Sequence, residues 1–178
     1  MSRIPTPATI DAAPAASRPL LEAVQKQFGV VPNLFRLVAN SPAALEGYLS
    51  LFGALGKGSL PAQTGERIAL AVAEINSCNY CLSAHTYLGK NLAKLDDAEI
   101  TANRNGASND PKADAAVRFA AKVARERGHV GEADVNGVKA AGYTDAQLVD
   151  ISLAFATTVF TNVFNRIADP EIDFPAVA

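Results

Sequence analysis

Hydrophobic residues recur along this chain at the three- and four-residue spacing of α-helices, and no window keeps the strict alternation of a half-buried strand. Residues that begin or end helices punctuate this pattern throughout. We therefore predict an all-α protein without internal repeats. The predicted helices cover residues 19–28, a short segment within 30–40, 42–56, 61–75, 78–90, 95–105, 111–127, 132–141 and 144–168.

Capping residues support several of these boundaries. Ser41 stands directly before a proline, the order that favours a helix start, and Thr144 begins a Thr-x-x-Gln capping box. Asn33, after another proline, is a further candidate cap. Each of these residues offers a side-chain oxygen to backbone N–H groups that have no partner inside the helix.

Two of the predicted helices are apolar on most sides, over residues 68–73 and 151–164. Such a helix has to be central to a core or covered by another subunit, and we expect a homo-oligomer. Asn162 and Asn165 would need hydrogen-bond partners inside the protein. Because polar residues interrupt the second run, which falls short of the about 20 apolar residues of a membrane span, we predict a buried helix and no membrane association.

Composition and charge narrow the class of protein. The chain has 178 residues, of which 49% are hydrophobic and 19% charged, as in a globular domain. We predict an extended N-terminal arm over 1–17 and a single helical domain over 18–178. The formal net charge is -2 and no basic block is present, so we expect no nucleic-acid partner. The first residues lack the apolar run of a secretory signal, and we expect the protein in the cytoplasm.

The candidate chemistry is concentrated in a short segment, CNYCLSAH. It holds both cysteines of the chain, Cys78 and Cys81, and one of the two histidines, His85. These residues stand at i, i+3 and i+7 and share one helix face. With Asn76 and Ser77 as capping side chains, Cys78 would occupy the first helical turn, where free N–H groups and the helix dipole favour a thiolate. His85 can exchange a proton near neutral pH.

Glu66 is the fourth candidate, twelve residues before the first cysteine and just before the run IALAVA. If the chain reverses near Asn76, two helices can lie side by side and bring Glu66 toward the cysteine face. Glu66 could then orient His85 or pass a proton through a water. Glu74 is a competing carboxylate, closer in sequence to the thiols.

Other interpretations of the cluster remain open at this point. The cysteines could be small buried residues. Two thiolates, the imidazole and a carboxylate could also bind zinc, although no second C-x-x-C completes a familiar zinc site. Haem attachment would need histidine directly after the second cysteine, where Leu82 stands. We expect neither a metal nor another cofactor.

These residues resemble a known family. The segment ERIALAVAEINSCNYCLSAHTYLG is similar to the core motif of alkylhydroperoxidase D (AhpD)-like proteins, within the carboxymuconolactone decarboxylase family. That motif is Glu, eleven residues, Cys-x-x-Cys, three residues and His, and Glu66, Cys78, Cys81 and His85 match it. The flanks VPNLFRLVANSPAALEGYL and NVFNRIADPEIDFP resemble the peroxidase-related subgroup, so that the similarity spans residues 29–177.

The resemblance implies an AhpD-like helical domain with a central apolar helix pair, assembled as a homo-oligomer. It also implies a thiol-dependent hydroperoxide or disulfide reductase, in which the cysteines cycle between dithiol and disulfide while Glu66 and His85 relay protons. Its partners would be a hydroperoxide substrate and an external dithiol or lipoylated protein as reductant, with a peroxiredoxin as a possible further partner. The alternatives are decarboxylase-like chemistry on a small carboxylated ring compound and a non-catalytic redox-sensing oligomer. Spacing leaves open whether Cys78 or Cys81 attacks.

Overall fold

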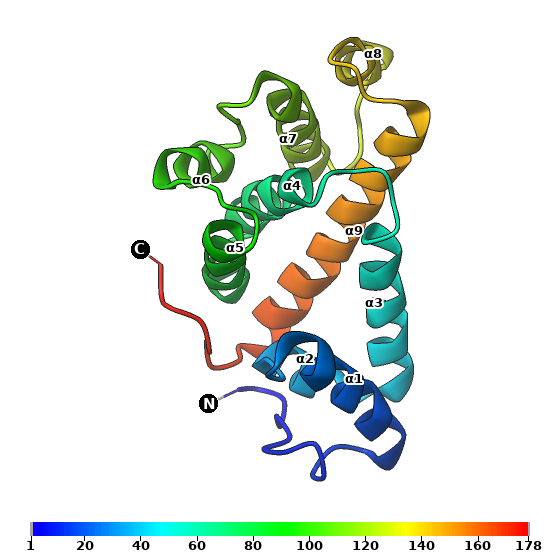
Figure 1. Cartoon of the computed structure of the whole chain (residues 1–178), viewed down its shortest axis with the longest axis vertical. Helices are drawn as coiled ribbons and strands as arrows, with labels where there is room; N and C mark the ends of the chain where they lie inside the picture. Colours follow the sequence, from blue (N-terminus) through cyan, green and yellow to red (C-terminus); the bar gives the residue numbers. More distant parts are fainter. Residues whose placement is uncertain (1, 178) are drawn as a thin grey trace.

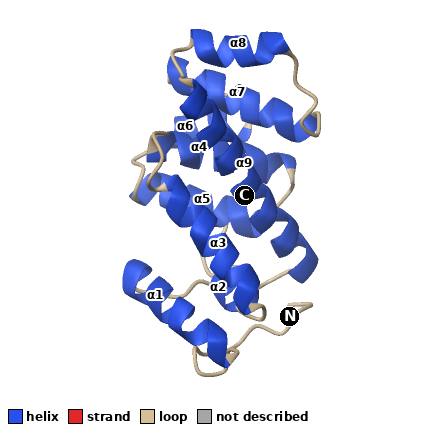
Figure 2. Ribbon diagram, turned by 90° about the vertical axis from the view of Figure 1, so that its right-hand side faces the viewer, coloured by secondary structure: helices blue, strands red, loops and turns tan. Residues whose placement is uncertain are grey.

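The computed structural model describes residues 2–177, and these residues form α-helices and one 3-10 turn, without strands (Figures 1 and 2). The prediction of an all-α protein is confirmed. The elements are η1 (Ala15–Ser17), α1 (Arg18–Phe28), α2 (Asn33–Val38), α3 (Pro42–Leu55), α4 (Ala62–Ile75), α5 (Asn79–Asn91), α6 (Asp97–Arg104), α7 (Pro111–Arg125), α8 (Glu132–Ala140) and α9 (Asp145–Ala168).

Local capping chemistry explains where these helices begin and end. The Ser41 hydroxyl accepts the Ala44 N–H at the start of α3, and Thr144 and Gln147 form the predicted capping box of α9. One predicted cap is wrong. Pro32 is the N-cap of α2, so Asn33 is its first helical residue. The Asn33 side chain instead donates to a backbone carbonyl of the C-terminal tail at 3.0 Å.

Helix α4 lies at the centre of the molecule, in contact with α5, α6, α7 and α9 (Figure 1). All six residues from 68 to 73 are buried, and Ile68, Leu70 and Val72 have no exposed surface. Complete burial of such side chains contributes roughly 1.5–3 kcal/mol each. The prediction that this apolar helix is central is therefore confirmed, and α4 gives the site on α4 and α5 a rigid support.

Helix α9 differs from the prediction of a helix buried on all sides. It packs against α3, α4, α5 and α7 but leaves the apolar residues Val149, Phe160, Val163 and Ile167 exposed. By length and composition alone, α9 could cross a membrane, and 33% of its most apolar window is buried inside the protein. Its outer face therefore has no cover within residues 2–177.

The chain ends pack against the body of the protein and lie on the same side of it (Figure 1). Before α1, the segment is less extended than predicted, because it contains the η1 turn and buries Ala13 and Ser17. The Arg3 N–H donates to the Ala168 carbonyl at 2.7 Å, which fixes the N-terminal segment to the end of α9. In the tail, Asp173 accepts the Asn33 N–H at 2.7 Å.

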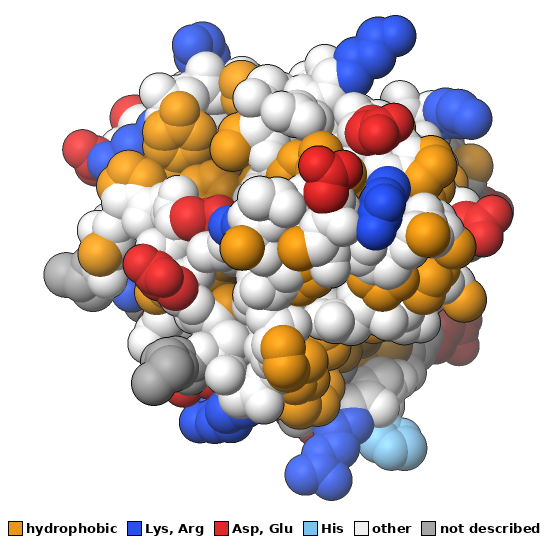
Figure 3. Space-filling view, turned by 90° about the horizontal axis from the view of Figure 1, so that it is seen from below, with side chains coloured by type: hydrophobic (Ala, Val, Ile, Leu, Met, Phe, Trp, Pro, Cys, Tyr) orange, Lys and Arg blue, Asp and Glu red, His pale blue; other side chains and the backbone are white. Residues whose placement is uncertain are grey.

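Figure 3 views the molecule from below, the end at which α1 and α2 lie in Figure 1. On this face, hydrophobic side chains gather in patches between scattered side chains of both charges. The face thus lacks the uniform positive charge that a nucleic-acid-binding surface would carry.

A buried polar network joins α4 to α6 and to the segment that follows α6. The Arg67 guanidinium lies 2.7 Å from the Glu99 carboxylate, and both side chains are mostly buried. Glu99 also accepts hydrogen bonds from Asn103, from the Ser108 hydroxyl and from the Asn109 N–H. Burial by itself would raise the pKa of Glu99, but these donors and Arg67 outweigh it and lower the pKa to about 2.

Candidate redox-active site

A tight turn between α4 and α5 creates the site. The Cys78 N–H donates to the Ala73 carbonyl and the Ser77 N–H to the Glu74 carbonyl, both at 3.0 Å. This is the Schellman pattern that ends a helix, and it places Ser77 in the left-handed region with φ of 53°. Glycine usually fills that position. The absence of glycine here explains why the sequence did not reveal the exact point of reversal.

Cys78 occupies the N-cap of α5, where its Sγ accepts the Cys81 N–H at 3.3 Å. The prediction that Cys78 lies in the first turn, capped by Asn76 and Ser77, is therefore wrong. One residue both completes the end of α4 and caps α5, because the two helices share a turn without a linker. The cysteine side chain has taken the place of the predicted caps.

Cys78 and Cys81 form a disulfide, with their Cα atoms 5.3 Å apart. Both residues are buried, with exposures of 1% and 2%. The spacing of three residues across the start of a helix brings the sulfurs into bonding distance without displacing other elements. The pair is therefore in its oxidised form in this structure.

The sulfur of Cys81 has a polar neighbour on another helix. Asn165 of α9 is buried, and its Nδ2 donates to Cys81 Sγ at 3.3 Å. Asn162, one turn earlier, accepts from the Asn76 side chain at 2.9 Å. Each asparagine therefore has one internal partner, as predicted, but Asn162 Nδ2 and Asn165 Oδ1 are buried without a hydrogen-bond partner in the described part of the chain. The contact with a sulfur was not anticipated, although an asparagine in an apolar helix was the signal that could have revealed it.

The structure brings Glu66 and His85 together as the reversal of the chain predicted. Glu66 Oε2 lies 2.9 Å from His85 Nδ1, and each side chain is about one-quarter exposed. The competing carboxylate, Glu74, is paired with Arg104 at 2.6 Å. His85 stands one helical turn after Cys81, but among residues 2–177 no hydrogen bond links its ring to either sulfur. A proton passing between them would need an intervening molecule.

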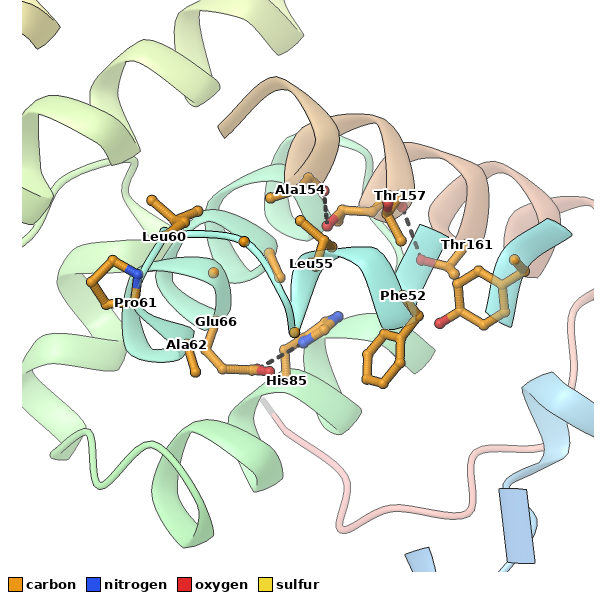
Figure 4. Close-up of a pocket in the computed structure, with 16 residues that line it drawn as sticks. Phe52, Leu55, Leu60, Pro61, Ala62, Glu66, His85, Ala154, Thr157 and Thr161 are labelled. Carbon is orange, nitrogen blue, oxygen red and sulfur yellow. Dashed lines mark hydrogen bonds and ion pairs between the residues drawn. The ribbon is translucent and has the colours of Figure 1, made fainter. Parts of the chain in front are cut away.

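The Glu66–His85 pair opens onto an apolar cavity of about 300 Å³ between α3, α4, α5 and α9 (Figure 4). Figure 4 shows the two side chains pointing toward one another at one side of this cavity, with Phe52 beside them and Thr157 of α9 across from them. Neither cysteine lines it. Tyr48 also lines the cavity, and burial, reinforced by the charge of Glu66, raises the pKa of its phenol. Tyr48 therefore remains a neutral hydrogen-bonding group.

A second, polar cavity of about 210 Å³ lies at the other end of the site, where α5 begins and α9 ends. Cys78 lines it together with Ser77, Arg3, Arg166 and Asp169. An Arg166 Nη1–H donates to the Ser77 carbonyl at 3.0 Å, while Arg3 lies 3.4 Å from Asp169. The first contact joins α9 to the turn that carries the disulfide, and the second joins the N-terminal segment to the residue that ends α9.

In the described part of the chain, no group of three or more His, Cys, Asp and Glu side chains is arranged to hold a metal ion. The two sulfurs are bonded to each other, and the Glu66–His85 pair stands apart from them without a direct hydrogen bond. The four candidate residues therefore form a disulfide at the start of α5 and a carboxylate–imidazole pair that joins α4 to α5.

Comparisons with known proteins agree with this architecture. Residues 42–126, which include all four candidate residues, match the model of the carboxymuconolactone decarboxylase family. No curated protein matches the chain. Among solved structures, an AhpD-core, uncharacterized peroxidase-related protein from Ralstonia eutropha JMP134 is 28% identical with a TM-score of 0.84, over 97% of this chain and 92% of that one.

Two further structures extend the comparison. An uncharacterized peroxidase-related protein from Silicibacter sp. TM1040 is 25% identical with a TM-score of 0.78, over 100% of this chain and 96% of that one. The debrominase Bmp8, as a cysteine-to-alanine variant in complex with 2,3,4-tribromopyrrole, is 18% identical with a TM-score of 0.80, over 97% of this chain and 94% of that one. At that identity, the likeness to Bmp8 shows the fold alone. Residues 42–126 thus resemble the carboxymuconolactone decarboxylase family, and the chain as a whole has the AhpD-like helical fold of the AhpD-core structure.

Proposed function

We propose that the chain is a thiol-dependent reductase of hydroperoxides that uses Cys78 and Cys81 as its redox pair. The observation that carries this proposal is the Cys78–Cys81 disulfide at the shared turn of α4 and α5, with the Glu66–His85 pair one helical turn further on. A disulfide that closes over three residues can open and close without unfolding its surroundings, as a catalytic pair must.

The reaction consumes one hydroperoxide and two thiols. A cysteine thiolate attacks the terminal oxygen, the O–O bond breaks, and the leaving alkoxide takes up a proton and departs as an alcohol. The resulting sulfenic acid condenses with the second thiol, forming the disulfide and releasing water. Two electrons pass from the sulfurs to the peroxide oxygens, and the two thiol protons end in the alcohol and the water.

The Glu66–His85 pair suits the proton transfers of this cycle. The imidazole can donate to a leaving oxygen and regain the proton from a thiol through a bridging molecule, while the carboxylate holds the ring in position. Since both side chains line the apolar cavity, an organic hydroperoxide could place its apolar body there. Its peroxide group would then face the imidazole, and a cysteine sulfur would have to move toward it after the disulfide is reduced, because neither cysteine lines this cavity in the oxidised form.

The disulfide has to be reduced from outside, because the chain has no third cysteine. An external dithiol or a lipoylated protein is the proposed reductant, with a peroxiredoxin as a possible further partner. A cytoplasmic location and assembly as a homo-oligomer belong to the same proposal, and a reducing compartment would supply the thiols.

Reductive debromination is a second candidate, because a thiol pair supplies two electrons to a carbon–bromine bond as well as to an oxygen–oxygen bond. The debrominase Bmp8 shares the fold, and the apolar cavity has room for a small ring. Decarboxylase-like chemistry on a ring compound and non-catalytic redox sensing need no thiol turnover. Decarboxylase-like turnover would survive alkylation of both thiols, whereas redox sensing would appear as a difference in oligomer size between the oxidised and the reduced protein.

Cys78→Ser and Cys81→Ser should each lower dithiol-dependent reduction of cumene hydroperoxide at least about a hundredfold, because loss of either member of a unit disables it. A matched control uses one reagent on two forms of the wild type. Iodoacetamide should abolish activity when added to the reduced protein and leave it intact when added to the disulfide form. Full activity in either serine variant would contradict the two-cysteine mechanism, and release of bromide from tribromopyrrole without peroxide turnover would favour the second candidate.

A further inference from the structure

The two sulfurs of the disulfide have different surroundings. Cys78 lines the polar cavity, and Ser77 and Arg166 at its rim are exposed to solvent. Cys81 lines neither of the two cavities, and its sulfur contacts the buried Asn165 side chain. Although both cysteines are almost completely buried, the polar cavity reaches Cys78, and neither cavity reaches Cys81.

Hydrogen bonding alone does not distinguish the sulfurs, since each accepts one hydrogen bond. Cys78 Sγ accepts the Cys81 N–H and Cys81 Sγ accepts Asn165 Nδ2–H, both at 3.3 Å. Thiol–disulfide exchange depends on access to the attacked sulfur and on the stability of the departing thiolate. Access favours attack on Cys78. Cys81 Sγ is then the departing sulfur. Its hydrogen bond from Asn165 becomes stronger as the thiolate forms, because a hydrogen bond to a thiolate is stronger than one to a neutral disulfide.

We propose that the polar cavity is the binding site of the thiol reductant, that the reductant attacks Cys78, and that Asn165 stabilises the departing Cys81 thiolate. The inference rests on the proposed function, since a redox pair that turns over needs an external reductant. The cavity is small and edged by Arg3, Arg166 and Asp169, so the ligand is a thiol carried on a narrow polar arm.

The exchange balances in two steps. One thiolate of the dithiol bonds to Cys78 Sγ, the Cys78–Cys81 bond breaks, and its electron pair remains on Cys81 Sγ beside the Asn165 amide. The second thiolate of the reductant attacks the reductant sulfur in the mixed disulfide and releases Cys78, which takes a proton from solvent. The dithiol loses two electrons to become a disulfide, and the cysteine pair gains them.

The direction of attack can be measured on the wild-type protein. The oxidised protein is treated briefly with 2-mercaptoethanol, the freed thiol is trapped with N-ethylmaleimide, and chymotrypsin cleaves after Tyr80, between the two cysteines. Mass spectrometry should find mercaptoethanol on Cys78 and maleimide on Cys81, in at least about tenfold excess over the reverse pattern. An equal mixture or the reverse pattern overturns the inference.

A pair of variants tests the role of Asn165. Asn165→Leu keeps the side-chain size but removes the donor, so exchange should slow about tenfold or more. In the reduced variant, alkylation of Cys81 should also require higher pH, a change that a merely structural role would not produce. Asn162→Leu is the matched control, because this neighbouring buried asparagine bonds to Asn76 and to no sulfur. Wild-type exchange and alkylation in Asn165→Leu would refute its role.

The exchange and alkylation experiments give a result whether or not the protein reduces hydroperoxides. Selective exchange at Cys78 without hydroperoxide turnover would support this inference and defeat the proposed function. Hydroperoxide turnover with unselective exchange would do the opposite. If Asn165→Leu does not fold, the labelling pattern of the wild type still decides which sulfur is attacked.

Discussion

At the scale of single residues, the site separates sulfur chemistry from proton transfer. The cysteines are buried and bonded to each other, while Glu66 and His85 are about one-quarter exposed and line the apolar cavity. The carboxylate is 2.9 Å from Nδ1, which leaves Nε2 free to face the cavity. Nε2 is therefore the atom placed to exchange a proton with a bound substrate.

His85→Ala should lower kcat/KM for a hydroperoxide about a hundredfold, a typical contribution of a positioned acid or base. It should also change the dependence of kcat/KM on pH over about pH 5 to 9, because the group that transfers the proton is gone. Glu66→Gln should have a smaller effect, since the amide can still orient the ring. Steady-state kinetics across this pH range provide the measurement, and His129→Ala, which removes the other, exposed histidine, is the control. An unchanged profile in His85→Ala would leave the imidazole with a packing role only.

At the scale of elements, the Glu99 network holds α4 against α6. The carboxylate receives the Arg67 guanidinium together with three neutral donors. Such a group is stable only when every donor is in place, because a buried charge without partners is unfavourable. Since α4 also carries Glu66, this network contributes to the rigidity of the site.

Glu99→Gln should lower the free energy of unfolding by about 3 kcal/mol near neutral pH, the value of a pKa shift from 4.5 to about 2. Because folding lowers this pKa, the unfolded state binds more protons, and the wild type loses the stabilisation as pH falls from about 4.5 toward 2. Urea denaturation at a series of pH values should thus show wild type and variant converging in acid. Glu126→Gln, at an exposed carboxylate, is the control, and a difference independent of pH would contradict the role of the charge.

The sequence predicted the helices well because their boundaries depend on local signals. Ser41 and Thr144 cap helices through bonds to residues three positions away, and such bonds are visible in the spacing alone. The sequence did not predict Cys78 as a cap, because Ser77 adopts the left-handed conformation at the reversal. A glycine at that position would have indicated where the helix ends. The Asn165–sulfur contact joins residues 84 positions apart, and no local pattern could have predicted its partner.

The sequence was equally unable to predict which distant residues line the two cavities. The motif spacing predicted that Glu66 and His85 could meet, since both lie on consecutive helices joined by one reversal. It could not show that Tyr48 of α3 shares their cavity or that Arg3 from the start of the chain lies near Cys78. Those positions follow from how distant elements pack, which depends on the whole set of buried side chains and not on one segment.

At the scale of the whole molecule, one helix remains incompletely covered. The exposed apolar residues Phe160, Val163 and Ile167 stand at i, i+3 and i+7 of α9 and so form a single stripe. Val149, three turns earlier, extends this stripe toward the start of the helix. A stripe of this length, left open to water, favours association with a second apolar surface.

We predict that a second copy of this chain covers the α9 stripe. Sedimentation of the wild type should therefore give a mass above the 18.6 kDa of one chain. Val163→Glu and Ile167→Glu should shift the protein toward 18.6 kDa, because each places an unpaired charge in the contact and repels its own copy. Leu92→Glu serves as the control, since this side chain is 70% exposed and lies outside α9. A wild type that sediments as a single chain at micromolar concentration would refute the prediction and leave the stripe free for another partner.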